Sequence, residues 1–375
     1  MRIAYPVFDY SKSGGVERVV KNMARICGEK GHEIHIFSSS IPGNGDHHAM
    51  TTFHNVAIPP APFFMRFYLF SRLASRQLKK HKFDIIHNQG ADSRVQDVIT
   101  AHSCHRAWLE YVRRTSTAGY IKRRLNPAHS VIIANEKLNY SPGNYKKIIA
   151  VSGNVKQDLM TFYGVPEKDI SVIPLGVDTT EFTPENKLLY RNNVRQSYNI
   201  SDDEFLILLV ANELRRKGLS VLLKALANMR DIPFRLMVVG CASTLAYAAQ
   251  AQRLGIKDRV LFIRATADIK RYYACADAFV MPTQYEPFGL VIIEAMASGL
   301  PVIVSKCAGA SSLLDEKQLI QNPLDVNEVA GKIRCLAEDS GFRTAAAKNA
   351  LSMVQKLSWE NTTEQVISVY KSIER

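Results

Sequence analysis

The feature that most constrains this chain is a repeated alternation of short apolar runs with amphipathic stretches. The first forty residues hold an apolar run at 3–7, a Gly14-Gly15 break, an amphipathic stretch over 16–29 and a second run at 34–37. Similar runs return at 83–87, 98–101, 147–152 and 170–174. Strands that alternate with helices predict a parallel sheet with helices on both faces, so we expect an α/β fold.

A second series of the same kind follows Pro174 and Gly176. Its apolar runs lie at 205–211, 234–240, 260–263, 278–281 and 301–304, and helices are expected near 325–340 and over 342–375. A length of 375 residues suits two domains. We predict an N-terminal domain over residues 1–172, a second domain over 173–355 and a C-terminal helix over 356–375 that packs back on the first. Open parallel sheets bind ligands at the carboxyl ends of their strands, so the chemistry is expected between the domains.

Composition excludes several classes of protein. The longest fully apolar run, 205–211, is far shorter than the roughly 20 residues that a membrane-spanning helix needs. The first residues do not resemble a secretory signal, so we expect a cytoplasmic protein. The six cysteines form no C-x-x-C pair, which argues against zinc ribbons, redox motifs and disulfides, and we expect them to be small buried side chains.

Positive charge is concentrated in the first half of the chain. Up to residue 175 there are 24 Lys and Arg against 13 Asp and Glu, and the remainder holds 24 against 22, so the two parts carry +11 and +2 of the net +13. This asymmetry indicates an anionic partner for the N-terminal domain.

The most informative motif is PTQYEPFGLVIIEAMASGLPVIV at 282–304. It places Glu286 in a loop and Glu294 in the helix that follows, with backbone amides at Phe288, Gly289 and Leu290 near the helix start. A helix N-terminus favours phosphate, and carboxylates accept hydrogen bonds from sugar hydroxyls, so this layout suits a nucleotide sugar. The alternative is an ordinary helix start with two solvated glutamates.

Three further candidate sites come shortly after an expected strand in the sequence. Arg216 and Lys217, just ahead of Gly218, are suited to a diphosphate, although the same run also suits a solvated loop. Gly14 and Gly15 allow a close backbone approach to a ligand, or mark a simple turn. His102 comes directly after the run at 98–101, at the carboxyl end of an expected strand, where it is either a functional or a structural histidine.

Taken together, these motifs resemble the retaining glycosyltransferases of family four, which have the GT-B fold of two Rossmann-like domains facing a central cleft. The resemblance covers nearly the whole chain. It rests on GGVER at 14–18, on IIAVSGNVKQDLMTFYGVPEKDISVIPLGVDTTEF at 148–182, and on Glu286 and Glu294 with seven residues between them.

The resemblance implies a role for each site residue. Glu286 binds hydroxyls of the donor hexose and Glu294 binds the ribose. Arg216 and Lys217 hold the leaving diphosphate, and His102 lies near the reacting sugar. The remaining donor contacts are implied for Gly14, Gly15, Arg264, Ala265, Pro287, Phe288, Gly289 and Leu290.

The resemblance also implies transfer with retention of anomeric configuration and without a cofactor. Ala211-Asn212 and Ala265-Thr266 depart from the usual family pattern around the base, and UDP is the nucleotide we expect. No D-x-D triplet occurs, so the carboxylate clamp of metal-dependent transferases lacks its ligands, and metal independence is expected. The leaving phosphate is expected to take the acceptor proton.

Two N-terminal segments mix aromatic and basic residues. Residues 63–82 hold six Lys and Arg with no acid, and residues 106–125 hold six against Glu110. A helix of this composition suits an anionic membrane surface. Alternatively, its apolar face packs on the protein core and its basic face is exposed to solvent. The second segment is similar to one in the lipopolysaccharide-core glucosyltransferases, which implies a membrane or acceptor role for Arg106, Trp108, Arg113, Arg114, Lys122, Arg123 and Arg124.

The predicted activity is therefore transfer of a hexose, with glucose expected, from a UDP-sugar to an anionic glycolipid at the inner face of the plasma membrane. A soluble acceptor, or a sugar-nucleotide epimerase with the same fold, is the enzymatic alternative. A basic protein that binds a membrane or nucleic acid is the non-enzymatic one. We expect no nucleic-acid partner, because the nearly neutral second domain holds most of the donor-site residues.

Overall fold

The computed structural model describes residues 1–11, 14–41, 49–240 and 242–373. The chain divides into two compact units. Unit 1 comprises Met1–Gly176 and Trp359–Arg375, and unit 2 comprises Val177–Ser358. These divisions lie within a few residues of the expected boundaries at 172 and 355, and the C-terminal helix belongs to unit 1.

Unit 1 is built on a seven-stranded parallel sheet in the order β3-β2-β1-β4-β5-β6-β7. Its strands are β1 (Arg2–Val7), β2 (Glu33–Ser38), β3 (Thr51–Asn55), β4 (Ile85–Gln89), β5 (Val98–Ala101), β6 (Lys147–Ala150) and β7 (Ile170–Val172). Its helices are α1 (Gly15–Glu29), α2 (Phe63–Leu78), α3 (His105–Thr115), α4 (Thr117–Arg124), α5 (Pro127–Asn139), α6 (Gly153–Tyr163) and α14 (Trp359–Ile373). The strand order reverses between β1 and β4, which is where doubly wound sheets bind ligands.

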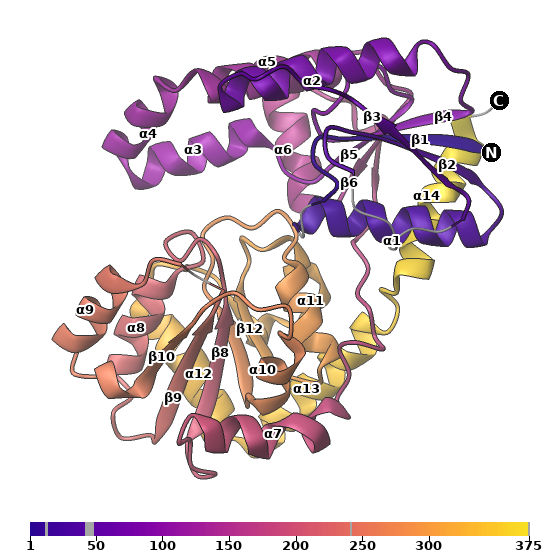
Figure 1. Ribbon diagram of the computed structural model, residues 1–375. Coiled ribbons are helices and arrows are strands. Elements are labelled where there is room, and N and C mark those ends of the chain that lie inside the picture. The colour runs from indigo at the N-terminus through magenta and orange to yellow at the C-terminus, as the bar shows by residue number, and fades with distance from the viewer. Residues whose placement is uncertain (12–13, 42–48, 241, 374–375) are drawn as a thin grey trace. The chain divides into compact units, whose positions relative to one another are not determined.

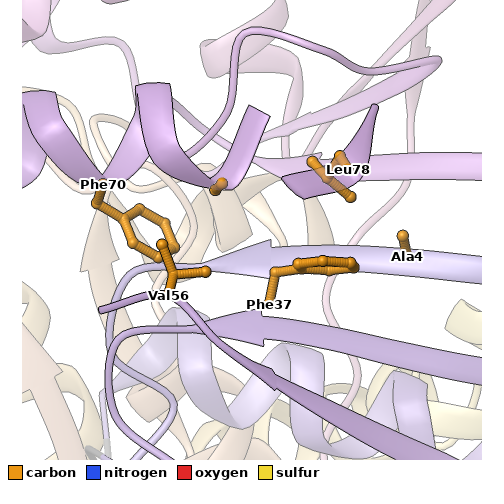
Figure 2. Packing of buried hydrophobic residues seen from close by; sticks show 6 residues of the cluster. Ala4, Phe37, Val56, Phe70 and Leu78 are labelled. Atoms are coloured by element: carbon orange, nitrogen blue, oxygen red, sulfur yellow. The ribbon is translucent and has the colours of Figure 1, made fainter. Parts of the chain in front are cut away.

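The two faces of this sheet bury different side chains. On one face, α2 contributes Phe70 and Leu78 to a core that also contains Ala4 and Phe37 from the strands (Figure 2). On the other face, α1 packs against α14 (Figure 1). Tyr5, next to Ala4 along β1, points toward this second layer, as the alternation of a strand requires.

A chain of buried hydrogen bonds ties α14 to the sheet. The Tyr370 hydroxyl lies 3.0 Å from the Tyr5 hydroxyl and 2.5 Å from His87 Nδ1, and His87 Nε2 lies 2.7 Å from Thr100 Oγ1. Burial lowers the pKa of His87 to about 3, so its ring is neutral at physiological pH. Buried polar groups are costly unless paired, so this network fixes where the last helix packs.

Unit 2 repeats the doubly wound topology with six parallel strands in the order β10-β9-β8-β11-β12-β13. Its strands are β8 (Phe205–Val210), β9 (Phe234–Val239), β10 (Val260–Ile263), β11 (Ala278–Met281), β12 (Val302–Ser305) and β13 (Leu319–Ile320). Its helices are α7 (Asn186–Ser197), α8 (Leu219–Ala227), α9 (Leu245–Arg253), α10 (Lys270–Cys275), α11 (Leu290–Ala297), α12 (Val326–Glu338) and α13 (Ser340–Val354).

The structure differs from the sequence-based picture in three details. The helical stretch expected over 342–375 is two helices, α13 and α14, separated by residues 355–358, and α14 corresponds to the C-terminal helix expected over 356–375. The edge strand β3, which has no fully buried residue, was not anticipated. Cys335 is exposed on α12 and Cys307 is half-buried, whereas Cys27, Cys104 and Cys275 are buried as expected; Cys241 lies outside the described residues.

Within the described part of the chain, no helix is long and apolar enough to cross a membrane.

Replacing Tyr370 with Phe tests the hydrogen-bond chain. The change removes one hydroxyl and leaves the buried Tyr5 hydroxyl and His87 Nδ1 without that partner, so we expect a loss of about 1–3 kcal/mol in the free energy of unfolding. Urea unfolding measures the loss. The control is Tyr198→Phe, which removes a half-buried hydroxyl 3.2 Å from that of Tyr272 and is expected to cost less than about 1 kcal/mol. Equal losses in both variants would contradict the prediction.

Candidate functional site

The predicted donor residues of unit 2 gather where its strand order reverses, between β8 and β11. Residues 211–218 connect β8 to α8, and residues 282–289 connect β11 to α11. The two loops therefore leave adjacent strands at the same edge of the sheet. This edge is the usual ligand-binding position of such a fold.

A buried cluster of charges joins the two loops. Arg216 Nη1 donates to Glu286 Oε2 at 3.0 Å and to the Tyr285 carbonyl at 2.6 Å, and Lys217 Nζ donates to the same carboxylate oxygen. Lys217 and Glu286 are buried, and Arg216 is half-buried. On its exposed side, Arg216 Nε also lies 3.1 Å from Glu213.

These contacts keep Glu286 ionised. Burial alone would raise the pKa of Glu286, but Lys217 and Arg216 outweigh it and hold that pKa below its usual range. Arg216, Lys217 and Glu286 together carry one positive charge, which the more exposed Glu213 carboxylate beside Arg216 offsets. The guanidinium and the ammonium group are suited to an anionic group.

Gly218 brings the two loops into contact. It adopts a left-handed conformation with φ of 81°, and a Cβ at this position would lie 2.0 Å from the Pro282 carbonyl oxygen. Next to it, the Arg216 carbonyl accepts hydrogen bonds from Gln284 N at 2.9 Å and from Thr283 Oγ1 at 3.1 Å. Only glycine combines this backbone conformation with so close an approach.

The loop that carries Glu286 presents free backbone donors. Its carbonyls are occupied, because Gly309 N donates to the Glu286 carbonyl and Ala310 N to that of Phe288, both at 2.9 Å. The amide groups of Phe288, Gly289 and Leu290 donate no hydrogen bond to any described residue. Gly289 has φ of 102° and directly precedes α11, so these donors stand at a helix N-terminus, where the helix dipole favours an anion.

Glu294 lies on α11, one turn beyond these amides. Its side chain is buried and accepts a hydrogen bond of 2.8 Å from the Tyr273 hydroxyl of α10. Sequence reasoning did not identify Tyr273 as its partner. The two carboxylates therefore differ in setting: Glu286 is held by cations and Glu294 by a phenol.

Other predicted donor contacts stand apart from the cluster. Arg264 and Ala265 are exposed in the loop after β10, two strands from β8 at the same edge of the sheet. In unit 1, Gly14 precedes α1 and its added Cβ would collide with the Glu17 carboxylate, while Gly15 is the first residue of the helix. Pro287 lies half-buried between Glu286 and Phe288.

His102 lies in unit 1, one residue beyond the end of β5. Its Nε2 is 2.9 Å from the side-chain oxygen of Gln89, the last residue of β4. Burial lowers the pKa of His102 to about 4, so its ring is neutral at pH 7. Gln89 was not identified from the sequence, although the alternation of β4 places it on the same face as His87.

The basic residues of α3 and α4 form a mostly exposed surface. Arg113 and Arg114 both bind Glu110, at 2.7 and 2.9 Å, and Arg106, Lys122 and Arg124 are exposed. Trp108 is half-buried, stacked on His105 and covered by the Arg123 guanidinium at 5.1 Å from its ring. The exposed apolar residues here are Ile121 and Leu125, which is 78% exposed.

Of the other segment, 63–82, α2 supplies core residues, as in the core-facing alternative, while Arg66, Arg76, Lys79, Lys80 and Lys82 are exposed. The side chains of Phe63 and Phe64 lie outside the described part of the structure. Among the residues that are described, no group of three or more His, Cys, Asp or Glu side chains is arranged to hold a metal ion.

Comparison with known protein families identifies both units. The model described as glycosyl transferases group 1 matches residues 191–353, and the model described as glycosyltransferase family 4 matches residues 13–181. Neither model alone covers half of the chain, but together they span nearly all of it.

Similar proteins span the full length of the chain. An uncharacterized glycosyltransferase, MJ1607, of Methanocaldococcus jannaschii is 26% identical over 99% of this chain and 98% of its own. The lipopolysaccharide glucosyltransferase WaaG of Escherichia coli K12 is 22% identical over 93% of both chains. The WaaG crystal structure superposes with a TM-score of 0.79 over 98% of this chain and 99% of WaaG. HepE of Anabaena in complex with UDP-glucose, 20% identical, superposes with a TM-score of 0.75 over 100% of both chains.

Replacing Gly218 with Ala tests how the two loops of unit 2 are joined. The Cβ would collide with the Pro282 carbonyl, and the left-handed backbone alone costs roughly 1–2 kcal/mol, so we expect a loss of about 2 kcal/mol or more in the free energy of unfolding. Urea unfolding measures the loss. The control is Gly331→Ala on α12, where no atom lies within 4 Å of the added Cβ and stability is expected to rise by about 0.5–1 kcal/mol. A neutral Gly218→Ala would show that the loops do not depend on this contact.

Proposed function

Because the chain belongs to the group 1 glycosyltransferases of family four, which have the GT-B fold, we propose that it transfers a hexose from a UDP-sugar to a glycolipid. Glucose is the hexose that we assign to the donor, and an anionic glycolipid of the lipopolysaccharide-core type is the acceptor. The observation that carries the proposal is the buried Glu286, held by Arg216 and Lys217 beside the free amides that precede α11.

The diphosphate, the hexose, the ribose and the uracil of the donor are each bound by different residues of this site. The free amides of Phe288, Gly289 and Leu290 and the charges of Arg216 and Lys217 bind the diphosphate. Glu286, ionised and adjacent to both cations, accepts hydrogen bonds from hexose hydroxyls. Glu294, one turn into α11, accepts hydrogen bonds from the ribose hydroxyls. The backbone around Arg264 and Ala265 contacts the uracil.

The transfer needs no protein nucleophile. The bond between the anomeric carbon and the diphosphate oxygen breaks, and a bond from that carbon to the acceptor oxygen forms on the same face of the sugar. The acceptor proton passes to the leaving diphosphate. Arg216, Lys217 and the helix N-terminus stabilise the negative charge that develops on the diphosphate, and such electrostatic stabilisation is the main source of rate enhancement for an enzyme without a covalent intermediate.

Two observations support UDP-glucose as the donor. HepE, which shares the fold, is described in complex with UDP-glucose, and WaaG is described as a glucosyltransferase. The cations of the cluster and the absence of a D-x-D triplet from the sequence favour a reaction that does not require a metal ion.

The surface formed by α3 and α4 is the site that we assign to the membrane and the acceptor. Exposed cations at Arg106, Lys122 and Arg124 flank the exposed side chains of Ile121 and Leu125. This mixture is typical of protein surfaces that lie on anionic lipid, where each nearby cation contributes about 1 kcal/mol. The protein would then work at the inner face of the plasma membrane as a peripheral enzyme.

Calorimetric titration with UDP-glucose in EDTA tests the donor site. We expect wild type to bind, and Glu294→Ala to bind at least about 10-fold more weakly, because hydrogen bonds to charged groups contribute roughly 1.5–3 kcal/mol. The control is Glu338→Ala, which removes an exposed carboxylate at the end of α12 and leaves affinity unchanged. UDP-galactose, UDP-N-acetylglucosamine and GDP-mannose test the choice of donor. Binding that requires a divalent cation, or that survives in Glu294→Ala, would contradict the proposal.

Flotation with phosphatidylglycerol vesicles tests the basic surface. Changing Arg114, Lys122 and Arg124 together to Gln is expected to weaken vesicle binding at least about 10-fold, since three cations leave the surface. The control changes three exposed cations of unit 2, Lys224, Arg253 and Lys257, to Gln and leaves binding unchanged. If both triple variants lose binding equally, net charge rather than this surface controls attachment.

A further inference from the structure

Two neighbouring strands of unit 1 pair polar side chains in a repeated geometry. In the parallel register of β4 with β5, His87 lies opposite Val98 and Gln89 lies opposite Thr100. Each β4 side chain bonds to the residue two positions beyond its partner. His87 contacts Thr100 at 2.7 Å, and Gln89 contacts His102 at 2.9 Å. These four side chains therefore share one face of the sheet.

His102 is neutral at physiological pH. Burial alone accounts for its lowered pKa, and within the described residues no carboxylate contributes to that shift. The titratable neighbour that interacts with it is His87 of β4, which is itself neutral and bonded to Tyr370 of α14. A neutral imidazole has one N–H and one bare nitrogen. The hydrogen-bond partner of one ring nitrogen therefore determines whether the other nitrogen donates or accepts a hydrogen bond.

Gln89 is the hydrogen-bond partner that determines the tautomer of His102. Its side chain is only 4% exposed, and its carbonyl oxygen faces His102 Nε2. A carbonyl oxygen can only accept a hydrogen bond, so Nε2 carries the proton and Nδ1 keeps a free electron pair. The amide nitrogen of Gln89 is buried and has no partner among the described residues. The one hydrogen bond that the Gln89 side chain makes to a described residue is therefore the bond to His102.

We propose that Gln89 is a positioning residue that holds His102 in the Nε2–H tautomer, so that Nδ1 accepts a hydrogen bond from a sugar hydroxyl. This inference rests on the proposed function, because it assigns the ligand of His102. It also assigns a preference: a sugar hydroxyl can donate to Nδ1, whereas a carboxylate at the same position would meet a second acceptor. His102 is thus a hydrogen-bond acceptor and not an acid.

Two variants of Gln89 separate its positioning role from mere packing. Gln89→Leu removes the acceptor, so the tautomer is no longer fixed and kcat/KM is expected to fall about 10-fold at every pH, which corresponds to about 1.4 kcal/mol. Gln89→Glu keeps an oxygen opposite Nε2–H but adds a negative charge. That charge favours the imidazolium form and raises the pKa of His102 by about 1–3 units.

The two changes therefore give different pH profiles. Protonation of Nδ1 removes the acceptor, so activity is lost as the pH falls through the pKa of His102. In Gln89→Glu this acidic limb moves at least about one unit toward neutral pH, while activity at pH 9 stays close to that of wild type. The control is Gln96→Leu, which removes a half-buried amide that bonds to Asn88 and Asn144 and does not contact His102. It is expected to lower stability and to leave the acidic limb unmoved.

The tautomer is measured directly by ¹⁵N NMR of histidine-labelled protein without substrate, with the His102 signals assigned by their loss in His102→Asn. We expect a protonated Nε2 and a bare Nδ1 at pH 7 in wild type, and averaged signals in Gln89→Leu. A proton on Nδ1 in wild type, or an unmoved His102 titration in Gln89→Glu, would overturn the inference even if the enzyme transfers sugar. If wild type transfers no sugar, the proposed function fails, and the NMR titration still decides whether Gln89 positions His102.

Discussion

The contact on which unit 2 most depends is the buried carboxylate of Glu286, shared by Arg216 and Lys217. Removing either cation would leave a buried charge with half of its compensation, which is strongly destabilising, whereas the intact cluster locks two loops from adjacent strands. Positive charge is thus held in place before any ligand arrives. An enzyme that stabilises a leaving diphosphate benefits from such preorganisation, because the groups need no rearrangement as charge develops.

The two units share a topology, but the buried cluster of unit 2 is charged, whereas His87 and His102 of unit 1 are neutral. In unit 2 the loops at the reversal of strand order carry ionised groups. In unit 1, burial lowers the pKa of His87, which lies within β4, and of His102, which follows β5, so both rings are neutral at pH 7. Cations suit anionic groups, whereas both carboxylates and neutral hydrogen-bonding groups suit hydroxyls. A single fold thereby supplies both kinds of surface through its loops.

Sequence patterns predicted most elements, because alternating apolar periods and glycine breaks act locally. They failed where tertiary contacts decide. The helical stretch expected over 342–375 is broken at residues 355–358, where the chain passes from unit 2 to unit 1. Glu286 and Glu294 were found from one motif, yet the contact of Arg216 with Glu286 spans 70 residues, and Gln89 reaches His102 only through the pairing of β4 with β5.

The position of His102 and the position of the basic surface are set together. Only Ser103 and Cys104 separate His102 from the start of α3, and no side chain of its own caps that helix. Glu136 of α5 accepts the His105 backbone N–H at 2.9 Å and the Tyr163 hydroxyl at 2.5 Å. A buried carboxylate from α5 therefore anchors the start of α3, three residues beyond His102.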